Sequence, residues 1–310
     1  MPKKTTILRH MRTFDHIALI YNPKSKGDAV QKAEMLQRAL ARRKQWIGAR
    51  AVLVPTQHAG HAKELAKEIS LAHKRPLIIS VSGDGGYNEV VNGAMEAKRM
   101  QKHAHPVVAV HSAGNANDHK RALQGGTSLT VLIRRGDPKP IDLLLFSAHG
   151  SGSAIERYAH SYISLGLTSE VAHKVNAHGK GFWREAKQIY WSFTSFTPLE
   201  IVRFGRKRRL HNIVFANIHT MAKVVQLDTK STVQDGKFEV IALTHHGKVR
   251  MLLSLVRAVL LGFRNPPSKR AYRFSVVREE VVQLDGETEK IPAKSTVRVS
   301  CQRRAIETLY

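Results

Sequence analysis

The feature that most constrains the fold is a change in hydrophobic pattern part-way along the chain. Between residues 16 and 123, short apolar runs alternate with longer segments whose apolar residues recur at helical spacing. After about residue 128, strand-like runs follow one another and are separated by polar, glycine-containing turns. The first pattern is typical of a mostly parallel sheet with helices on its faces, and the second favours an antiparallel sandwich or barrel. We therefore predict two domains, residues 1–126 and 127–310.

The first half reads as an α/β domain with a mostly parallel sheet. His16–Tyr21 has the apolar run of a buried strand, and Asp28 can cap the helix that follows it. Its predicted strands are 16–21, 50–54, 77–81 and 106–110, and its predicted helices are 29–44, 60–73 and 88–100.

The second half reads as a mainly antiparallel β-sandwich domain. Two amphipathic stretches, 182–196 and 248–263, interrupt its strands as helices. No apolar run approaches the roughly 18 residues of a membrane span, and no secretory signal follows the basic N-terminus, so we expect a cytoplasmic protein. The predicted strands are 129–133, 141–146, 199–204, 213–216, 238–243, 273–277 and 281–284.

Charge is the unusual part of the composition. The chain has 50 Lys and Arg against 24 Asp and Glu, a formal net charge of +26. An apolar share of 42% is ordinary for a packed protein and excludes a disordered basic tail. Such a charge attracts polyanions, which include nucleic acid, an anionic membrane surface and phosphorylated ligands. The single cysteine, Cys301, excludes an internal disulfide framework and favours a structural role for that residue.

The segment Ser82-Gly83-Asp84-Gly85-Gly86 lies between a predicted strand and a predicted helix. Its glycines let the backbone approach a ligand closely, and the N–H groups of such a turn form a nest for phosphate. Asp84 would repel that phosphate unless Mg²⁺ lies between them or the carboxylate accepts a proton from a hydroxyl. The alternative is a tight strand-to-helix turn in which Asp84 is the helix N-cap.

Two other loops, Asn22–Gly27 and His111–Arg121, also follow parallel strands. Open α/β sheets bind ligands at the carboxyl ends of their strands, so we expect the three loops to converge on a ligand.

These motifs resemble those of the diacylglycerol kinase catalytic-domain family, which includes bacterial lipid kinases, sphingosine and ceramide kinases and, more remotely, NAD kinases. Ser82–Gly85 followed by Asn88–Gly93 is similar to the nucleotide-binding signature of the family. The ordered resemblance spans about residues 16 to 290. Its further landmarks are Asn22-Pro23 with Gly27, Thr56, Gly60, Gly114-x-x-Asn117-Asp118, Ile141-Asp142-Leu143, Asp235–Val240 and Leu284-Asp285-Gly286-Glu287.

The resemblance implies an ATP-dependent lipid kinase of phospholipid metabolism, acting on the hydroxyl of diacylglycerol, a long-chain base or ceramide. It implies that Asp84 helps to hold Mg²⁺ and that Asp285 or Glu287 is the general base. The resemblance also implies a second metal site, formed by Thr232, Asp235 and the carbonyl of Lys237, and a supporting acidic network of Asp118 and Asp142. The ATP-binding residues that it implies are Asn22, Thr56, Ser82, Gly83, Asp84, Gly85, Gly86, Asn88, Glu89 and Asn115.

The residues alone leave alternatives open. Asp285-Gly286-Glu287 also reads as a plain hairpin turn, and Asp235-Gly236 as a turn without metal. Gly86 and Asn115 stand where the family usually has threonine, so a second interpretation is a degenerate kinase fold that binds nucleotide or lipid without turnover. The net positive charge suggests a third interpretation, a basic nucleic-acid-binding protein that reuses the fold.

The expected partners are a membrane lipid substrate and the anionic inner membrane surface, on which the protein would be peripheral. Nonspecific nucleic-acid binding and a homodimer stay open. A basic run beside the predicted aromatic helix 182–196 could contact anionic headgroups; it comprises Arg203, Arg206, Lys207, Arg208 and Arg209.

Overall fold

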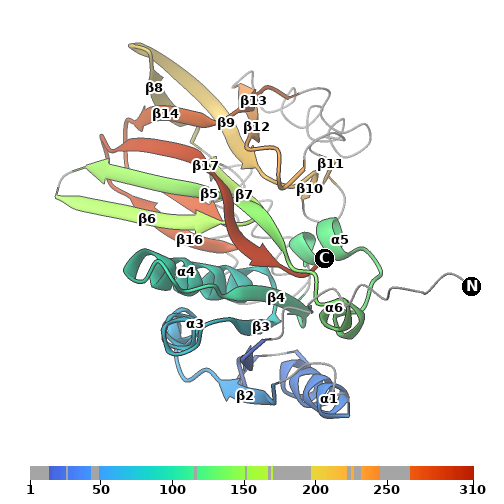
Figure 1. The fold of residues 1–310 in the computed structure, drawn as a ribbon. Helices are drawn as coiled ribbons and strands as arrows, with labels where there is room; N and C mark the ends of the chain where they lie inside the picture. The colour runs from blue at the N-terminus through green and yellow to red at the C-terminus, as the bar shows by residue number, and fades with distance from the viewer. Residues whose placement is uncertain are drawn as a thin grey trace, which may run out of the picture. The chain divides into compact units, whose positions relative to one another are not determined.

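The computed structural model forms two compact units (Figure 1). The first comprises Met1–Asn115, Leu123–Pro140 and Ile306–Tyr310, and the second comprises Ala116–Ala122 and Ile141–Ala305. The boundary predicted after residue 126 therefore lies inside the first unit, and the chain end returns to that unit. The structure describes residues 14–25, 27–42, 49–114, 117–150, 152–166, 169, 197–221, 225–226, 232–244 and 266–310.

The first unit is built on a parallel sheet in the order β2-β1-β3-β4, as the alternating pattern predicts. Residues Glu307 and Thr308 of β17 add to it beside β4, also in parallel. Both faces of the sheet are covered, because successive residues of β1 from Ile17 to Ile20 are at most 1% exposed. The strands are β1 (His16–Tyr21), β2 (Ala51–Pro55), β3 (Pro76–Ser82) and β4 (Val107–Ser112).

Helices α1 (Ala29–Ala41) and α6 (Leu129–Arg135) pack on one face of this sheet. Helices α3 (His61–Ala72) and α4 (Asp84–Met100) pack against each other and against β1 and β3. Helix α4 begins four residues earlier than predicted, so the glycines of the loop lie in its first turn.

The predicted strand 129–133 is wrong, because this segment forms helix α6. Leu129, Leu132 and Ile133 are buried, and their spacing places them on one face of a helix. Gly136 ends the helix in the left-handed conformation. A short run of apolar residues does not distinguish a strand from a helix by itself. Here the segment is a helix, because that conformation places its three buried residues on one face.

The second unit is mainly antiparallel, as predicted. Its strands follow the order β16-β15-β7-β9-β8-β14-β17, with β5 beside β17 and β6, and β12 beside β9 and β13. Phe146, Phe215, Phe238 and Phe274 come from four different strands and meet in one core. The strands are β5 (Lys139–Gly150), β6 (Ser153–Ala159), β7 (Tyr162–Gly166), β8 (Leu199–Arg203), β9 (Arg206–Ala216), β12 (Phe238–Thr244), β13 (Ser268–Lys269), β14 (Ala271–Val276), β15 (Glu280–Leu284), β16 (Glu287–Ile291) and β17 (Thr296–Thr308).

Three smaller elements complete the description: α5 (Asp118–Gln124), β10 (Thr220–Met221) and β11 (Val225–Gln226). The predicted helices 182–196 and 248–263 lie outside the described residues. Among the helices that the structure does describe, none has the length and apolarity to cross a bilayer.

Candidate functional site

Three loops meet at the carboxyl ends of β1, β3 and β4, as predicted. The Ala113 N–H donates to the Ser82 carbonyl at 3.0 Å, which joins the ends of β3 and β4. A Cβ on Gly83 would lie 3.3 Å from the Cα of Gly114, and a Cβ on Gly27 would lie 3.1 Å from the Ala113 carbonyl. The approach is thus backbone against backbone, and small residues at these positions permit it.

The start of α4 supplies the anion-binding chemistry of this loop cluster. Gly83 is the N-cap, and the first intrahelical bond runs from the Tyr87 N–H to the Gly83 carbonyl at 3.1 Å. The N–H groups of Gly85 and Gly86 therefore have no carbonyl within the helix to donate to. With the positive end of the helix dipole, such groups bind phosphate. Asp84 occupies the first helical position, so it is not the N-cap of the alternative interpretation.

The side chain of Ser82 fills the space that a side chain at position 86 would need. A Cβ on Gly86 would lie 2.6 Å from Ser82 Oγ and 2.7 Å from Ser82 Cβ, which is closer than real contacts allow. The Ser82 hydroxyl lies 2.7 Å from Ser80 Oγ and donates to the Gly83 carbonyl at 2.9 Å. Position 86 therefore lacks a hydroxyl, but a hydroxyl from position 82 occupies the same side of the helix start.

Three predicted ATP-binding residues make local contacts within the first unit. The Glu89 carboxylate accepts the Gly60 N–H at 3.3 Å and so ties the loop before α3 to α4. The Thr56 N–H donates to the Tyr21 carbonyl at 2.9 Å, which fixes the end of β2 beside β1. The exposed Asn22 accepts the Lys24 N–H at 2.8 Å, as in an Asx turn.

The other two predicted ATP-binding side chains stand differently. Asn88 is fully buried, and its side-chain oxygen accepts a hydrogen bond from Asn92 at 3.0 Å. Asn115 lies outside the described residues.

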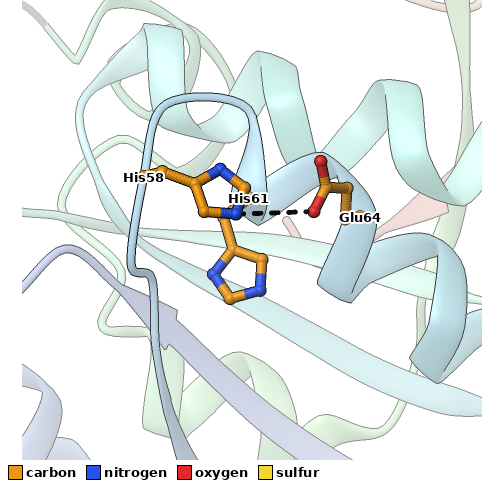
Figure 2. A group of neighbouring side chains, drawn as sticks. All are labelled: His58, His61 and Glu64. Atoms are coloured by element: carbon orange, nitrogen blue, oxygen red, sulfur yellow. Dashed lines mark ion pairs between the residues drawn. The ribbon is translucent and has the colours of Figure 1, made fainter.

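Figure 2 shows a group at the start of α3, His58, His61 and Glu64, whose ligand atoms lie within 4.8 Å of one another. His58 Nε2 lies 3.8 Å from Glu64 Oε2. The imidazole rings are stacked, with centroids 4.6 Å apart and planes 22° apart. Because a ring nitrogen binds metal in the ring plane, nearly parallel rings do not aim at one ion. His61 Nδ1 also accepts the Gln57 N–H at 3.0 Å, so in the neutral ring Nε2 carries the proton. These side chains form a polar cluster whose ring geometry does not suit a single metal ion.

In the second unit, Asp285 and Gly286 form the two-residue turn between β15 and β16, with φ angles of 51° and 102°. The hairpin that the Asp-Gly pair predicts is present. The Asp285 carboxylate is fully buried. Its Oδ1 accepts the N–H groups of Ser161 and Tyr162, each at 2.9 Å, and its Oδ2 accepts the His160 N–H at 2.6 Å. The carboxylate thus holds the entry to β7.

A buried polar chain continues from Asp285. His160 Nε2 lies 3.3 Å from Asp285 Oδ2, and His160 Nδ1 lies 2.8 Å from Ser161 Oγ. Ser161 Oγ is 3.3 Å from His119 Nδ1, and the two imidazole rings meet edge to face at 4.4 Å. Burial, together with the nearby His160, holds the pKa of His119 well below its usual value, so His119 is neutral at pH 7.

Asp142 and Asp118, the predicted acidic network, have different contacts. The fully buried Asp142 carboxylate accepts the N–H groups of Gly236 and Arg304, each at 2.7 Å. Asp118 accepts a hydrogen bond from Arg121 at 3.3 Å. Burial and the neighbouring Asp142 raise the pKa of Cys301 to about 12, so the thiol stays protonated, in agreement with a structural role.

The predicted second metal site is a compact turn. The Asp235 carboxylate accepts the Lys237 N–H at 2.8 Å and the Thr232 N–H at 3.4 Å. Thr232, Asp235 and Lys237 are therefore brought together, as the resemblance implies. These backbone bonds also account for the turn without an ion, so the metal site stays a prediction.

Comparison with known sequences finds a protein family whose model matches part of the chain. Residues 16–146 match the sequence profile of the diacylglycerol kinase catalytic domain, a span that contains the glycine turn and all three converging loops. This segment, which is less than half of the chain, is similar to the catalytic domain of diacylglycerol kinases. Asp285 and Glu287 lie beyond the matched span, so their roles rest on the structure and on the resemblance.

Two curated relatives are similar to part of the chain, and both are named diacylglycerol kinase. One, from Bacillus subtilis strain 168, is 36% identical over 133 residues, which is 40% of this chain and 40% of the relative. The other, from Staphylococcus carnosus strain TM300, is 28% identical over 167 residues, 53% of this chain and 49% of the relative. The chain thus spans less than half the length of the curated relatives that it matches.

Solved structures extend the fold likeness to nearly the whole chain. A diacylglycerol kinase from Bacillus anthracis strain Sterne has a TM-score of 0.68 at 17% identity, with 96% of this chain and 97% of that chain covered. A putative diacylglycerol kinase from the same strain has a TM-score of 0.69 at 17% identity and the same coverage. At such identity the likeness establishes the fold of the two units.

Sequence reasoning missed the buried residues that hold Asp285. His160 and Ser161 follow a strand with no motif around them, and His119 follows the Gly114-x-x-Asn117-Asp118 landmark without belonging to it. The available signal was weak: a His-Ser pair at the start of an apolar strand, where a buried polar group needs a partner.

Proposed function

We propose that the protein is an ATP-dependent lipid kinase that transfers the γ-phosphoryl group to the hydroxyl of a lipid such as diacylglycerol or a long-chain base. The observation that carries the proposal is the start of α4, where Gly85 and Gly86 present N–H groups amid three converging loops of a diacylglycerol kinase catalytic domain. Donors fixed in this way can bind the phosphates of a nucleotide.

In this proposal the first unit binds the donor nucleotide. The N–H groups of the α4 turn bind phosphate oxygens, and Asn22, Thr56 and Glu89 provide polar contacts around the turn. Asp84 is part-exposed at the first helical position and offers the carboxylate oxygens that Mg²⁺ prefers. When bound, Mg²⁺ offsets negative charge on the transferring phosphoryl group.

The proton acceptor follows from the two carboxylates of the second unit. Both oxygens of Asp285 already accept backbone N–H groups, and the side chain has no exposed surface. Glu287, two residues on, is partly exposed at the start of β16. We therefore assign the general base to Glu287 and a positioning role to Asp285, which shapes the hairpin that carries Glu287.

The test is transfer of label from γ-labelled ATP, with Mg²⁺, to a panel of lipids in mixed micelles. The wild type should label at least one lipid hydroxyl. Asp84→Asn should lower the rate about a thousandfold, since it removes a carboxylate that holds the metal. Asp137→Asn, an exposed carboxylate of the same unit, is the matched control and should leave the rate unchanged.

Failure of every lipid to accept label would overturn the proposal. ATP binding without transfer would then identify the degenerate kinase fold that Gly86 and Asn115 leave open. A kinase of this kind would act in lipid metabolism at the cytoplasmic face of a membrane, because its acceptor lies in the bilayer and its donor in the cytosol.

A further inference from the structure

The turn between β8 and β9 carries an aromatic side chain that local physics disfavours. The two turn residues, Phe204 and Gly205, have φ angles of 51° and 72°. Such a tight hairpin prefers Asn or Gly at both positions, and a bulky residue in the left-handed region is strained. Phe204 is also 84% exposed, more than any other large hydrophobic side chain that the structure describes. The hairpin itself therefore gives no reason for phenylalanine at this position.

Basic residues surround this aromatic side chain. Arg203 lies directly opposite Arg206, so the last cross-strand pair before the turn consists of like charges. The guanidinium of Arg203 stacks over the Phe204 ring at 4.4 Å and over the Tyr272 ring at 4.0 Å, which keeps this charge beside the turn. Four consecutive exposed basic residues, 206–209, then continue along β9.

These charges are only partly neutralised. Glu200 pairs with Lys207 at 2.7 Å and with Arg209 at 2.8 Å, and this one carboxylate serves both. Within the part of the chain that the structure describes, Arg206 and Arg208 take part in no ion pair. The turn thus ends in an exposed ring with unneutralised cations behind it. Figure 1 shows this turn at the outer end of the long β8–β9 ribbon of the second unit.

We propose that this hairpin tip, Arg203 to Arg208, docks the protein on an anionic lipid bilayer by inserting Phe204 below the headgroups. An aromatic ring flanked by cations matches the layered chemistry of that surface, since the ring enters the acyl boundary while the guanidinium and ammonium groups stay at the level of the phosphates. The docking is distinct from the proposed kinase activity, because it needs neither nucleotide nor the first unit.

The tip fits a bilayer better than a nucleic acid. Single-stranded nucleic acid is held by aromatic platforms on which successive bases stack along a basic groove. Here Phe204 lies in the turn that ends a ribbon, and the ring of Tyr272 is covered by the guanidinium of Arg203. Nucleic-acid binding is therefore treated as an outcome of the test.

The test measures partition of the full chain to sedimenting vesicles without ATP, at low and high salt. Vesicles of phosphatidylcholine mixed with phosphatidylglycerol should bind the protein, and phosphatidylcholine alone should bind it weakly. Phe204→Asn should lower the partition constant about tenfold, the effect of losing one inserted aromatic ring. Asparagine suits the left-handed turn, so this variant should fold at least as stably as the wild type.

The electrostatic part is tested by the double variant Arg206→Ala/Arg208→Ala. It should lower binding at low salt about tenfold and flatten the salt dependence, since each basic residue near an anionic surface contributes up to about fivefold. Arg134→Ala/Arg135→Ala removes the same charge from exposed positions on α6 and should bind nearly as the wild type does. Met100→Ser, at the 63% exposed end of α4, is the matched apolar control.

A direct probe of insertion uses Phe204→Cys labelled with an environment-sensitive fluorophore. Labelling should be selective, because Cys301 is the single native cysteine and its thiol stays protonated. Emission should shift to shorter wavelength on addition of anionic vesicles. Wild-type binding by Phe204→Asn, or an unshifted emission on vesicles that sediment the protein, overturns the proposal. Loss of RNA binding in Phe204→Asn with vesicle binding intact would assign the tip to nucleic acid instead.

Discussion

Asp84-Gly85 of the first unit and Asp285-Gly286 of the second are two of the three Asp-Gly pairs in the chain, and their carboxylates lie in opposite environments. Asp84 begins helix α4 and is part-exposed where the N–H groups of the turn point outward. Asp285 begins a hairpin turn and is fully buried, with three backbone N–H groups aimed at its oxygens. The same dipeptide thus leaves its carboxylate part-exposed in one unit and holds backbone together in the other. The comparison teaches that partners, and not the motif, decide what a carboxylate does.

The largest expected effect is a difference in the free energy of unfolding between variants of Asp285 and of Asp84. Asp285→Asn places an amide group against N–H donors, so it should lower the free energy of unfolding by about 3 kcal/mol, whereas Asp84→Asn should change it by less than about 0.5 kcal/mol. Urea denaturation followed by circular dichroism measures both. Asp235→Asn, in an exposed Asp-Gly turn, is the control and should cost far less.

Glu287→Gln sharpens the same comparison. It should stay close to wild-type stability and lose lipid phosphorylation, because it replaces the proposed base by an amide of the same size at a partly exposed position. Equal stability of Asp285→Asn and the wild type would contradict the positioning role. Full activity of Glu287→Gln would return the base to Asp285.

The next effect concerns the glycine turn itself. Gly86→Thr should lower the free energy of unfolding by about 2 kcal/mol, because its Cβ would overlap the Ser82 side chain. The double variant Ser82→Gly/Gly86→Thr should recover most of that loss and bind ATP at least as well as the wild type. A double-mutant cycle on unfolding and on ATP binding measures the coupling. Additive losses would show that the two positions do not share one space.

The smallest effect tests the surroundings of Asp285. His119 is buried with a lowered pKa, so below about pH 6.5 the unfolded chain takes up a proton that the folded chain refuses. Stability should therefore fall with acidification, by at most about 1.4 kcal/mol per pH unit from this residue, and only above its folded pKa. His119→Asn should reduce the slope between pH 6.5 and 5 in denaturation curves.

An exposed histidine of the first unit provides the reference for that slope. His103→Asn should leave it as in the wild type. An unchanged slope in His119→Asn would show that this histidine is not held neutral in the fold.

Much of the first unit could be predicted from local pattern. Strands β1, β2, β3 and β4 and helices α1 and α3 lie within a few residues of their predicted positions, and the three loops meet as expected. The segment 129–133 failed, because its run of apolar residues suits either state and only the face that it buries distinguishes them.

The candidate site also has one part that local sequence predicts and one part that only the tertiary structure shows. The sequence by itself determined the glycine turn, because its glycines, its flanking strand and its helix are neighbours along the chain. The tertiary structure alone decided the fate of Asp285, whose partners His160, Ser161 and Tyr162 are more than 120 residues away. It alone exposed Phe204 and brought Glu307 beside Val107. Adjacent residues predict the local backbone conformation, whereas the burial and hydrogen bonding of a side chain depend on segments that only folding brings together.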